Sequence, residues 1–238
     1  MFNAVDLLGF KINTQTFKEI YDSNKKTIAT INSYSYSVAK KDKVFAEALK
    51  ASDVLLPDGI GIVWATKFLH NKEIQRRTGP ECMDFVLEMA NLNSEKVFFL
   101  GSTDYVLEKI KKKVRRNYPN IAVGTLSPPF VEQLSSDENK IIIGEINSFN
   151  PDHLFVGMTA PKQEKWVFTT EKKLNSKKIY SVGAAFDWFA ETKKKPSKFA
   201  EKYHLVTFER ALREPRILLR ILQIFPLISN IIFEKTKR

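Results

Sequence analysis

The sequence predicts an α/β fold in which a mostly parallel, Rossmann-like sheet is flanked by helices on both faces. Short apolar runs rich in β-branched residues alternate with longer amphipathic stretches, which is the pattern of consecutive βαβ units. Most of the runs end in polar or glycine-containing tips, and ligands bind at the carboxyl ends of strands in such sheets. After the last run the composition changes, which predicts a C-terminal helical appendage.

The expected strands are short segments dominated by apolar and β-branched residues. They cover Thr27–Ile31, Val54–Leu56, Val97–Leu100, Ile121–Val123, Leu154–Val156 and Ile179–Val182. Helices are expected where apolar residues recur at helical spacing, over Val38–Leu49, Glu81–Ala90, Val106–Val114, Val131–Ile146 and Lys162–Leu174. Another helix is expected directly after Asp58-Gly59. Trp64, Trp166 and Trp188 are expected in the core.

The strand tips hold most of the candidate site residues. They read Thr30-Ile-Asn32, Asp58-Gly59, Gly101-Ser-Thr103, Gly157 to Glu164, and Gly183-Ala-Ala-Phe-Asp187. Because the strands are expected to be parallel, these tips should converge on one edge of the sheet. Asp58 is the most informative, since an apolar run stops abruptly at this carboxylate and a new apolar segment follows at once.

Each tip also has a purely structural interpretation. Asp58 is either a general base or ligand-binding carboxylate or the N-cap of the following helix, and residue type alone favours the cap. Thr30 and Asn32 either hydrogen-bond a sugar or a base, or cap a helix that starts near Ser35, with about equal support. Gly101 opens a helix whose N–H groups suit a phosphate, although an ordinary strand–helix junction is favoured.

Two further motifs combine helix-start chemistry with polar groups. Pro161-Lys-Gln-Glu164 begins a helix well, and its Gln163 and Glu164 are also suited to gripping a polar ligand. Arg76-Arg77-Thr78-Gly79 precedes another helix. It is either a solvated turn or an anion clamp, because arginine presents a rigid fork of donors to phosphate oxygens.

Composition narrows the class of partner. The net charge of +11 and the pI of about 9.5 predict an anionic partner: a nucleotide, a diphosphate, nucleic acid or an acidic membrane surface. Cys82 is the single cysteine, so no intrachain disulfide forms and a reducing compartment fits. A zinc site is not expected. Neither a signal peptide nor a run of about 20 apolar residues is found, so the sequence predicts a cytosolic protein.

The predicted boundary lies at residue 190, between a Rossmann-like core over 1–190 and an appendage over 191–238. The appendage holds 12 Lys and Arg against 5 Glu, a net charge of +7. Its arginines recur every three or four residues beside apolar ones, at Arg210, Arg213, Arg216 and Arg220. Such a helix either packs on the core with a solvated basic side, or lies on an anionic membrane and reaches into a phosphate site. The apolar tail after Leu222 favours the membrane.

Taken together and in order, these motifs resemble the WecG/TagA/CpsF family of bacterial glycosyltransferases. The matching segments are Thr30-Ile-Asn32, Asp58-Gly-Ile-Gly61, Arg76 with Thr78-Gly79, Phe98-Phe-Leu-Gly101, Tyr118-Pro119, Pro161-Lys-Gln-Glu164, Val182-Gly-Ala-Ala-Phe-Asp187 and Glu214-Pro-Arg216. The similarity runs from about Val5 to about Leu222. It departs from the family pattern at Thr159, Lys195-Pro196 and His204-Leu-Val-Thr207, which leaves the acceptor and the exact donor open.

The resemblance implies an inverting transferase that moves N-acetylmannosamine or a related hexose from a UDP-sugar to a polyprenyl-diphosphate-linked sugar. The products serve cell-surface polysaccharide or teichoic acid synthesis. The family pattern implies that Asp58 is the catalytic base. Substrate binding is expected from Thr30, Asn32, Gly59, Arg76, Gly101, Gln163, Glu164, Asp187, Arg210, Arg216 and Arg220.

No Asp-x-Asp run is present, so activity without a metal is expected, with arginines and helix N-termini stabilising the leaving diphosphate. No cofactor beyond the UDP-sugar is expected. The expected location is the cytoplasmic face of the membrane, held peripherally, with no nucleic-acid partner. A nucleotide-binding Rossmann oxidoreductase, and a glucose or mannosaminuronic acid donor within the same family, remain alternatives. Oligomeric state stays open, a homo-oligomer included.

Overall fold

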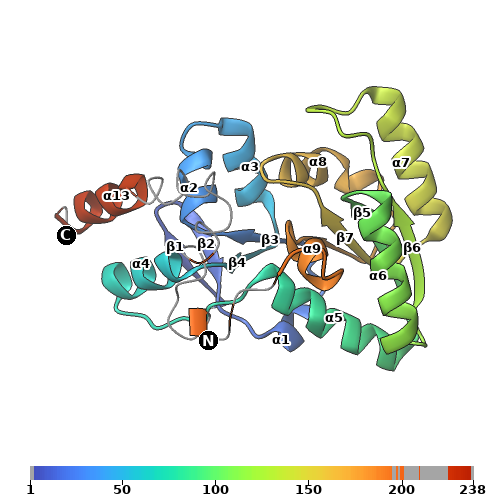
Figure 1. Cartoon of the computed structure of the whole chain (residues 1–238). Coiled ribbons are helices and arrows are strands. Elements are labelled where there is room, and N and C mark those ends of the chain that lie inside the picture. Colours follow the sequence, from blue (N-terminus) through green and yellow to red (C-terminus); the bar gives the residue numbers. More distant parts are fainter. Residues whose placement is uncertain (1–2, 195–196, 198, 201–208, 210–224, 237–238) are drawn as a thin grey trace.

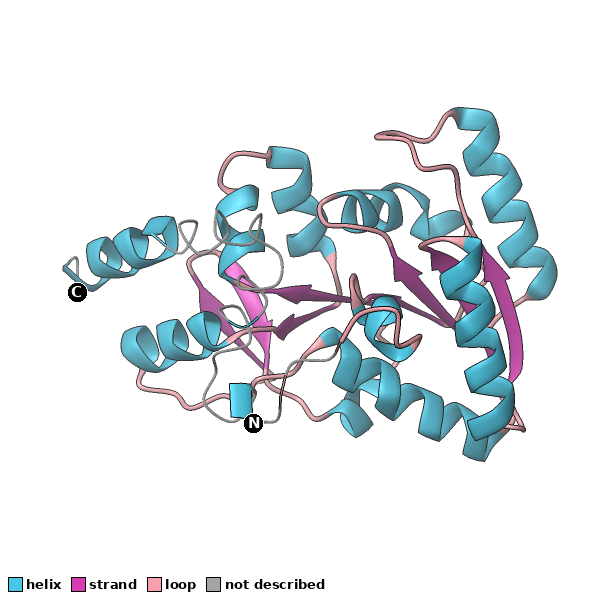
Figure 2. Ribbon diagram, viewed as in Figure 1, coloured by secondary structure: helices cyan, strands magenta, loops and turns pink. Residues whose placement is uncertain are grey.

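A computed structural model describes residues 3–194, 197, 199–200, 209 and 225–236. The centre of the protein is a six-stranded sheet in the order β4-β3-β8-β7-β5-β6, in which every neighbouring pair is parallel (Figures 1 and 2). The predicted fold class, a parallel sheet flanked by helices, is therefore confirmed.

All six expected strands form. They are β3 (Thr27–Ile31), β4 (Val54–Pro57), β5 (Lys96–Gly101), β6 (Ala122–Leu126), β7 (His153–Gly157) and β8 (Lys178–Ser181). Their four central members are almost wholly buried, because helices cover both faces. This explains why the runs read as continuously apolar rather than alternating.

Helices form one layer on each face of the sheet (Figure 1). One layer contains α1 (Phe17–Tyr21), α5 (Gly79–Asn93), α6 (Asp104–Asn117) and α9 (Ala185–Phe189), which share a core cluster with the strands. The other contains α2 (Ser33–Ala39), α3 (Lys43–Ala51), α7 (Ser136–Phe149) and α8 (Lys162–Thr170), followed by the short 3₁₀ helix η1 (Glu171–Lys173). Each layer buries a separate set of strand side chains, as expected from their alternation.

Several element boundaries differ from the sequence prediction. The expected helix Val38–Leu49 is two helices: α2 ends at Ala39, and α3 begins after Asp42, whose side chain caps it by accepting a hydrogen bond from the Phe45 N–H at 3.0 Å. The expected helix from Val131 begins only at Ser136, since Ser135 and Glu138 form a capping box there. Local capping chemistry thus overrides the apolar spacing.

An N-terminal hairpin was missed. Its strands, β1 (Ala4–Leu7) and β2 (Phe10–Asn13), are antiparallel, and both Leu8 and Gly9 between them have positive φ. A leucine at this position is not a usual turn signal, so residue type did not indicate a hairpin. The hairpin packs with α2, α3 and α4 (Ile60–His70) and with α13 (Phe225–Thr236).

The tryptophans were predicted only in part. Trp166 is buried as expected and Trp188 is half-buried, but Trp64 on α4 is 69% exposed, so its assignment to the core was wrong. The other face of α4 buries Ile62, Ala65 and Leu69. A helix that is apolar on both faces cannot be oriented from its periodicity.

The chain leaves β3 and β8 toward opposite faces of the sheet. After β3 it enters α2 in one layer, and after β8 it enters α9 in the other. Since β3 and β8 are neighbours, a crevice is expected outside their carboxyl ends, which is where open α/β sheets bind ligands.

The predicted boundary at residue 190 stays a prediction, because most of 195–224 lies outside the described residues. Within the described part, α13 packs on α2 and α4 through Leu227, which is 1% exposed. None of the described helices has the length and apolar character to cross a membrane.

Candidate active site

The tips of β3 and β4 bring Asp58, Gly59 and Asn32 together. The Asp58 N–H donates to the carbonyl of Ile31 at 2.8 Å. Gly59 has a φ of +116°, and a Cβ there would lie 3.3 Å from the Asn32 Cβ. Glycine at this position therefore lets the backbone take a positive φ while it passes close to Asn32.

Asp58 is not the N-cap of the helix that follows it. The cap position falls on Gly59, which has no side chain with which to cap the first turn of α4. The capping interpretation that residue type favoured is thus wrong for Asp58, which is half-buried beside the helix start. Its expected role as the base remains compatible with this position.

Asn32 does act as a cap. Its Oδ1 accepts a hydrogen bond from the Ser35 N–H at 3.0 Å, and the Ser35 hydroxyl accepts one from the Asn32 N–H at 2.8 Å. Thr30 lies within β3, half-buried and in the same strand alternation as Ile28. Of the two interpretations left open, capping therefore holds for Asn32 and not for Thr30. Substrate binding by either residue stays a prediction.

A second group of residues joins the tip of β8 to two helix starts. The Gly183 N–H donates to Oε1 of Gln163, on the first turn of α8, at 3.1 Å. Gly79 begins α5, and a Cβ added to it would lie 2.9 Å from the Val182 carbonyl oxygen. Because β8 neighbours β3, these contacts place Gln163 and the Thr78-Gly79 turn at the crevice predicted between the two strands.

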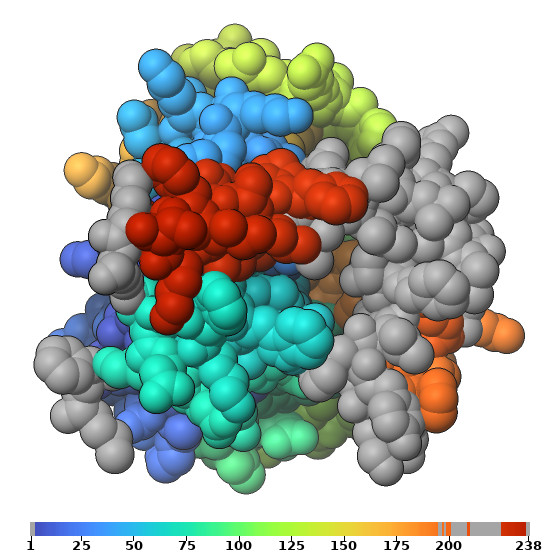
Figure 3. Space-filling model, turned by 90° about the vertical axis from the view of Figure 1, so that its left-hand side faces the viewer, coloured from blue at the N-terminus to red at the C-terminus, as the bar shows by residue number. Residues whose placement is uncertain are grey.

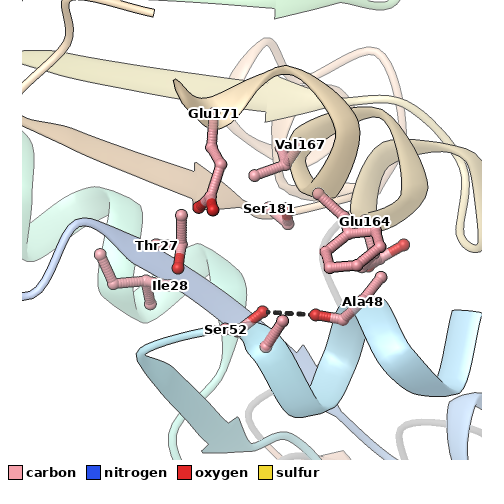
Figure 4. A pocket seen from close by; sticks show the side chains of 10 residues that line it. Thr27, Ile28, Ala48, Ser52, Glu164, Val167, Glu171 and Ser181 are labelled. Atoms are coloured by element: carbon pink, nitrogen blue, oxygen red, sulfur yellow. Dashed lines mark hydrogen bonds between the residues drawn. The ribbon is translucent and has the colours of Figure 1, made fainter. Parts of the chain in front are cut away.

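Glu164 lies beneath α8 rather than at the open edge of the sheet. It is 4% exposed, and its Oε1 accepts a hydrogen bond from Nε2 of Gln163 at 2.8 Å. Its other oxygen has no hydrogen-bond partner among the described residues. Figure 4 shows Glu164 beside a small cavity that Thr27, Ser52 and Ser181 also line. Burial raises the pKa of its carboxyl group to about 7, since an apolar environment disfavours the ionised form. This placement suits support of Gln163 better than direct contact with a ligand.

The basic loop is fixed to the sheet through Arg77. Its N–H donates to the Pro57 carbonyl at 2.9 Å, next to Asp58. The Arg77 side chain is buried against the Phe17 ring and donates to Oε1 of Gln75 at 3.1 Å. Burial lowers the pKa of its guanidinium group. Arg76 alone was predicted as the substrate-binding arginine of this loop. Nothing in the residue pattern indicates that Arg77 is the buried member of the pair.

Arg76 is more accessible. Its Nη2 lies 3.2 Å from Oε1 of Glu81, and its side chain is 27% exposed. Glu81 also completes a capping box with Thr78 at the start of α5. The structure thus holds Arg76 near the same helix start that meets the tip of β8, while leaving part of its guanidinium group open to solvent.

Gly101 and Asp187 have clear structural roles. A Cβ on Gly101, which has a φ of +126°, would lie 2.5 Å from the Gly157 carbonyl oxygen on the neighbouring strand. Asp187 on α9 pairs with Lys193 at 3.1 Å and accepts a hydrogen bond from the Thr192 hydroxyl at 3.3 Å. These contacts organise the sheet edge and the chain after α9. Substrate binding by Gly101 and Asp187 stays a prediction.

Arg210, Arg216 and Arg220 lie outside the described residues. Among the described residues, no group of three or more His, Cys, Asp or Glu side chains could hold a metal ion. The described residues therefore bring the Asp58 carboxylate, the Asn32 and Gln163 amides and the starts of α4 and α5 to the edge of the sheet where the crevice is expected. Amides and helix N-termini favour anionic groups such as a diphosphate.

An open parallel sheet with a polar crevice at its switch point is typical of nucleotide-binding α/β proteins. Sequence comparison specifies the class. The model of the Glycosyl transferase WecG/TagA/CpsF family matches residues 5–238, and the chain belongs to this family. The protein is therefore a glycosyltransferase, which sets aside the oxidoreductase alternative.

Curated relatives agree. The chain is 31% identical over 211 residues to an N-acetylglucosaminyldiphosphoundecaprenol N-acetyl-beta-D-mannosaminyltransferase of Staphylococcus aureus strain MRSA252, covering 89% of this chain and 81% of the relative. It is 30% identical over 213 residues to the enzyme of the same name from strain MW2, covering 90% and 82%. Both alignments extend over most of each protein.

Proposed function

We propose that the protein transfers N-acetylmannosamine from a UDP-sugar to N-acetylglucosamine on a polyprenyl diphosphate. The names of its relatives support the transferred sugar and the acceptor. The observation that carries the proposal is the position of Asp58, whose backbone is bonded to the end of β3 beside Asn32, at the edge where the crevice is expected. A role in cell-surface polysaccharide or teichoic acid synthesis follows from such an acceptor.

The reaction is a single displacement with inversion. An acceptor hydroxyl oxygen attacks the anomeric carbon, the Asp58 carboxylate takes the hydroxyl proton, and the bond from the anomeric carbon to the phosphate oxygen breaks. UDP leaves with the electron pair of that bond. Attack from the side opposite the leaving group inverts the anomeric configuration.

Negative charge that develops on UDP needs positive partners. The N–H groups at the start of α4, directly after Asp58-Gly59, and the partly exposed Arg76 supply such partners. We assign the same task to Arg210, Arg216 and Arg220 of the appendage, and we propose that catalysis needs no metal ion. Gln163, fixed by Gly183, would hold the donor sugar or its diphosphate.

The proposed location is the cytoplasmic face of the membrane, where the protein is held peripherally. A lipid-linked acceptor requires access to the bilayer, and the net charge of +11 favours an anionic surface.

A donor panel tests the function. The full chain is mixed with a short-chain polyprenyl-diphosphate N-acetylglucosamine acceptor and, in turn, with UDP-N-acetylmannosamine, UDP-N-acetylmannosaminuronic acid and UDP-glucose. The released UDP and the disaccharide-lipid product are quantified. Product from UDP-N-acetylmannosamine alone is expected. Product from UDP-glucose or the uronic acid instead would refute the proposed donor, and no product with any of the three would refute the proposed acceptor.

A further inference from the structure

Helix α4 is apolar on two faces. One face buries Ile62 and Leu69 against the core, while the other exposes Trp64 by 69% and Phe68 by 55%. Trp64 and Phe68 are four residues apart, so they lie on the same side of the helix. A helix that is apolar all round normally lies inside a protein core or in contact with lipid, and the Trp64 and Phe68 side of α4 is exposed instead.

Helix α13 has the same character. Leu227 is buried, whereas Phe225, Ile228 and Ile232 are 61%, 41% and 55% exposed. These three residues follow the spacing i, i+3, i+7 and form one stripe. Phe233 is also exposed. The helix is therefore attached to the core by one apolar side and presents a second apolar side outward.

The two helices form one surface. They are in direct contact, and the Lys235 ammonium lies 5.5 Å from the centre of the Phe68 ring. Figure 3 shows α13, in red, directly beside the teal segment that contains α4. We name this the α4–α13 surface and define it by Trp64, Phe68, Phe225, Ile228, Ile232 and Phe233. Of the fourteen exposed large apolar residues in the described part of the chain, these six lie together on two helices.

The α4–α13 surface is continuous with the candidate site. Helix α4 begins directly after Asp58-Gly59, and at 1.5 Å per residue Trp64 and Phe68 lie about 6 and 12 Å along its axis from its first residue. A Cβ on Gly61, in the first turn, would lie 3.7 Å from the Leu227 side chain. Both helices therefore extend from the edge of the sheet that carries the proposed base.

We propose that the α4–α13 surface docks the protein on an anionic bilayer, with Trp64 and Phe68 of the catalytic core in contact with lipid beside the appendage. The inference rests on the proposed lipid-linked acceptor and extends it, because the core itself, and not only the appendage, faces the membrane. Tryptophan and phenylalanine suit the headgroup region, where apolar rings are buried near polar groups. Lys235 borders the Phe68 ring and matches anionic lipid in charge, whereas Lys67 on the same helix is paired with Glu73 at 2.6 Å.

A second copy of the chain is the competing occupant of this surface. Each copy has a net charge of +11, so two copies repel each other while an anionic bilayer attracts both. Charge thus favours the membrane, and self-association becomes one outcome of the test.

Fluorescence quenching measures contact of Trp64 with lipid directly. The full chain is mixed with anionic phosphatidylglycerol vesicles that contain brominated acyl chains. Trp166 is buried and Trp188 is half-buried, so quenching is expected in the wild type and should fall at least threefold in Trp64→Phe, which keeps an aromatic anchor. Equal quenching in both proteins, or none in the wild type, would overturn the proposal.

Vesicle binding tests the whole surface. Trp64→Ser with Phe68→Ser should lower binding to anionic vesicles at least tenfold, whereas Leu92→Ser, at an exposed position on α5, should leave it unchanged. Circular dichroism confirms folding, and transfer to a water-soluble acceptor should be unchanged, which separates this inference from the proposed function. Unchanged binding by the double variant, or a wild-type dimer in sedimentation that the double variant converts to monomer without loss of vesicle binding, would contradict membrane docking.

Discussion

The side-chain oxygen of Gln163 accepts a hydrogen bond from the backbone N–H of Gly183 at 3.1 Å. This contact ties the first turn of α8 to the tip of β8, so two motifs that are about twenty residues apart in sequence act as one unit. Glu164 holds the other end of the same amide. The orientation of Gln163 is therefore set from both sides, which is what a group that must meet a ligand at a fixed place requires.

The contact between Gly79 and Val182 should limit what residue 79 can be. Gly79→Ala places a methyl group 2.9 Å from the Val182 carbonyl oxygen, so α5 must move away from the tip of β8. We expect a loss of about 1–3 kcal/mol in the free energy of unfolding, measured by urea denaturation, together with weaker UDP binding.

Gly144→Ala is the matched control. Gly144 lies within α7, and an added Cβ meets nothing within 4 Å. This change should be neutral or stabilise the protein by up to about 1 kcal/mol. If the two variants unfold at the same urea concentration, the close packing at Gly79 does not exist as described.

The raised pKa of Glu164 should make stability fall with rising pH. The pKa is about 7 in the folded protein against 4.5 as the ordinary value, so the folded state binds more protons than the unfolded state between these values. The shifted pKa does not affect the free energy of unfolding below about pH 4.5. It lowers the free energy of unfolding as pH rises, by about 3 kcal/mol above pH 7.

Glu164→Gln keeps an acceptor for Gln163 but cannot ionise. The free energy of unfolding of the variant, relative to that of the wild type, should therefore increase as pH rises from 4.5 to 7. Glu132→Gln, at an exposed position, should track the wild type throughout. Parallel curves for Glu164→Gln and the wild type would show that this carboxyl group is not perturbed.

Arg76 should matter for substrate more than for stability. Its ion pair with Glu81 is partly exposed, so Arg76→Ala should cost less than about 1 kcal/mol of stability. We expect at least a tenfold loss in kcat/KM for the UDP-sugar, because an arginine fork that binds phosphate is removed. Glu81→Gln retains a capping side chain and tests the pair alone. An equal loss of activity in Glu81→Gln would mean that Arg76 acts only through Glu81.

Transfer should also survive removal of divalent metal ions. The chain has no Asp-x-Asp run, and the proposal assigns charge stabilisation to arginines and helix N-termini. Activity in excess chelator should stay within about twofold of the untreated enzyme, a change below roughly 0.4 kcal/mol. Loss of activity that manganese or magnesium restores would show that the diphosphate needs a metal.

The sequence predicted the strands well because burial on both faces leaves an unmistakable apolar signal, as in Val54–Leu56 and Ile179–Val182. It also placed Asp58, Gln163 and Gly183 at strand tips. It failed where three-dimensional context decides. Residue type could not tell that Gly59 rather than Asp58 occupies the N-cap position of α4, or that Arg77 rather than Arg76 is buried.

The exposure of individual apolar side chains could not be predicted from the sequence either. The periodicity of α4 is the same whether Trp64 faces the core or the outside, because both faces of the helix are apolar. The hairpin turn at Leu8-Gly9 gave no signal either, since its leucine adopts a left-handed conformation that residue type does not suggest.

The central claim is that Asp58 removes the proton from the acceptor hydroxyl. Asp58→Asn preserves side-chain size and leaves the backbone bond to Ile31 in place, so the variant should fold and its affinity for UDP should stay within about twofold of wild type. General-base catalysis, by contrast, accelerates a reaction by about a hundredfold or more. The decisive measurement is single-turnover transfer from UDP-N-acetylmannosamine with enzyme in excess over donor. A rate at least about a hundredfold lower, with UDP binding intact, is the predicted result. Transfer at the wild-type rate would contradict the account and place the base elsewhere.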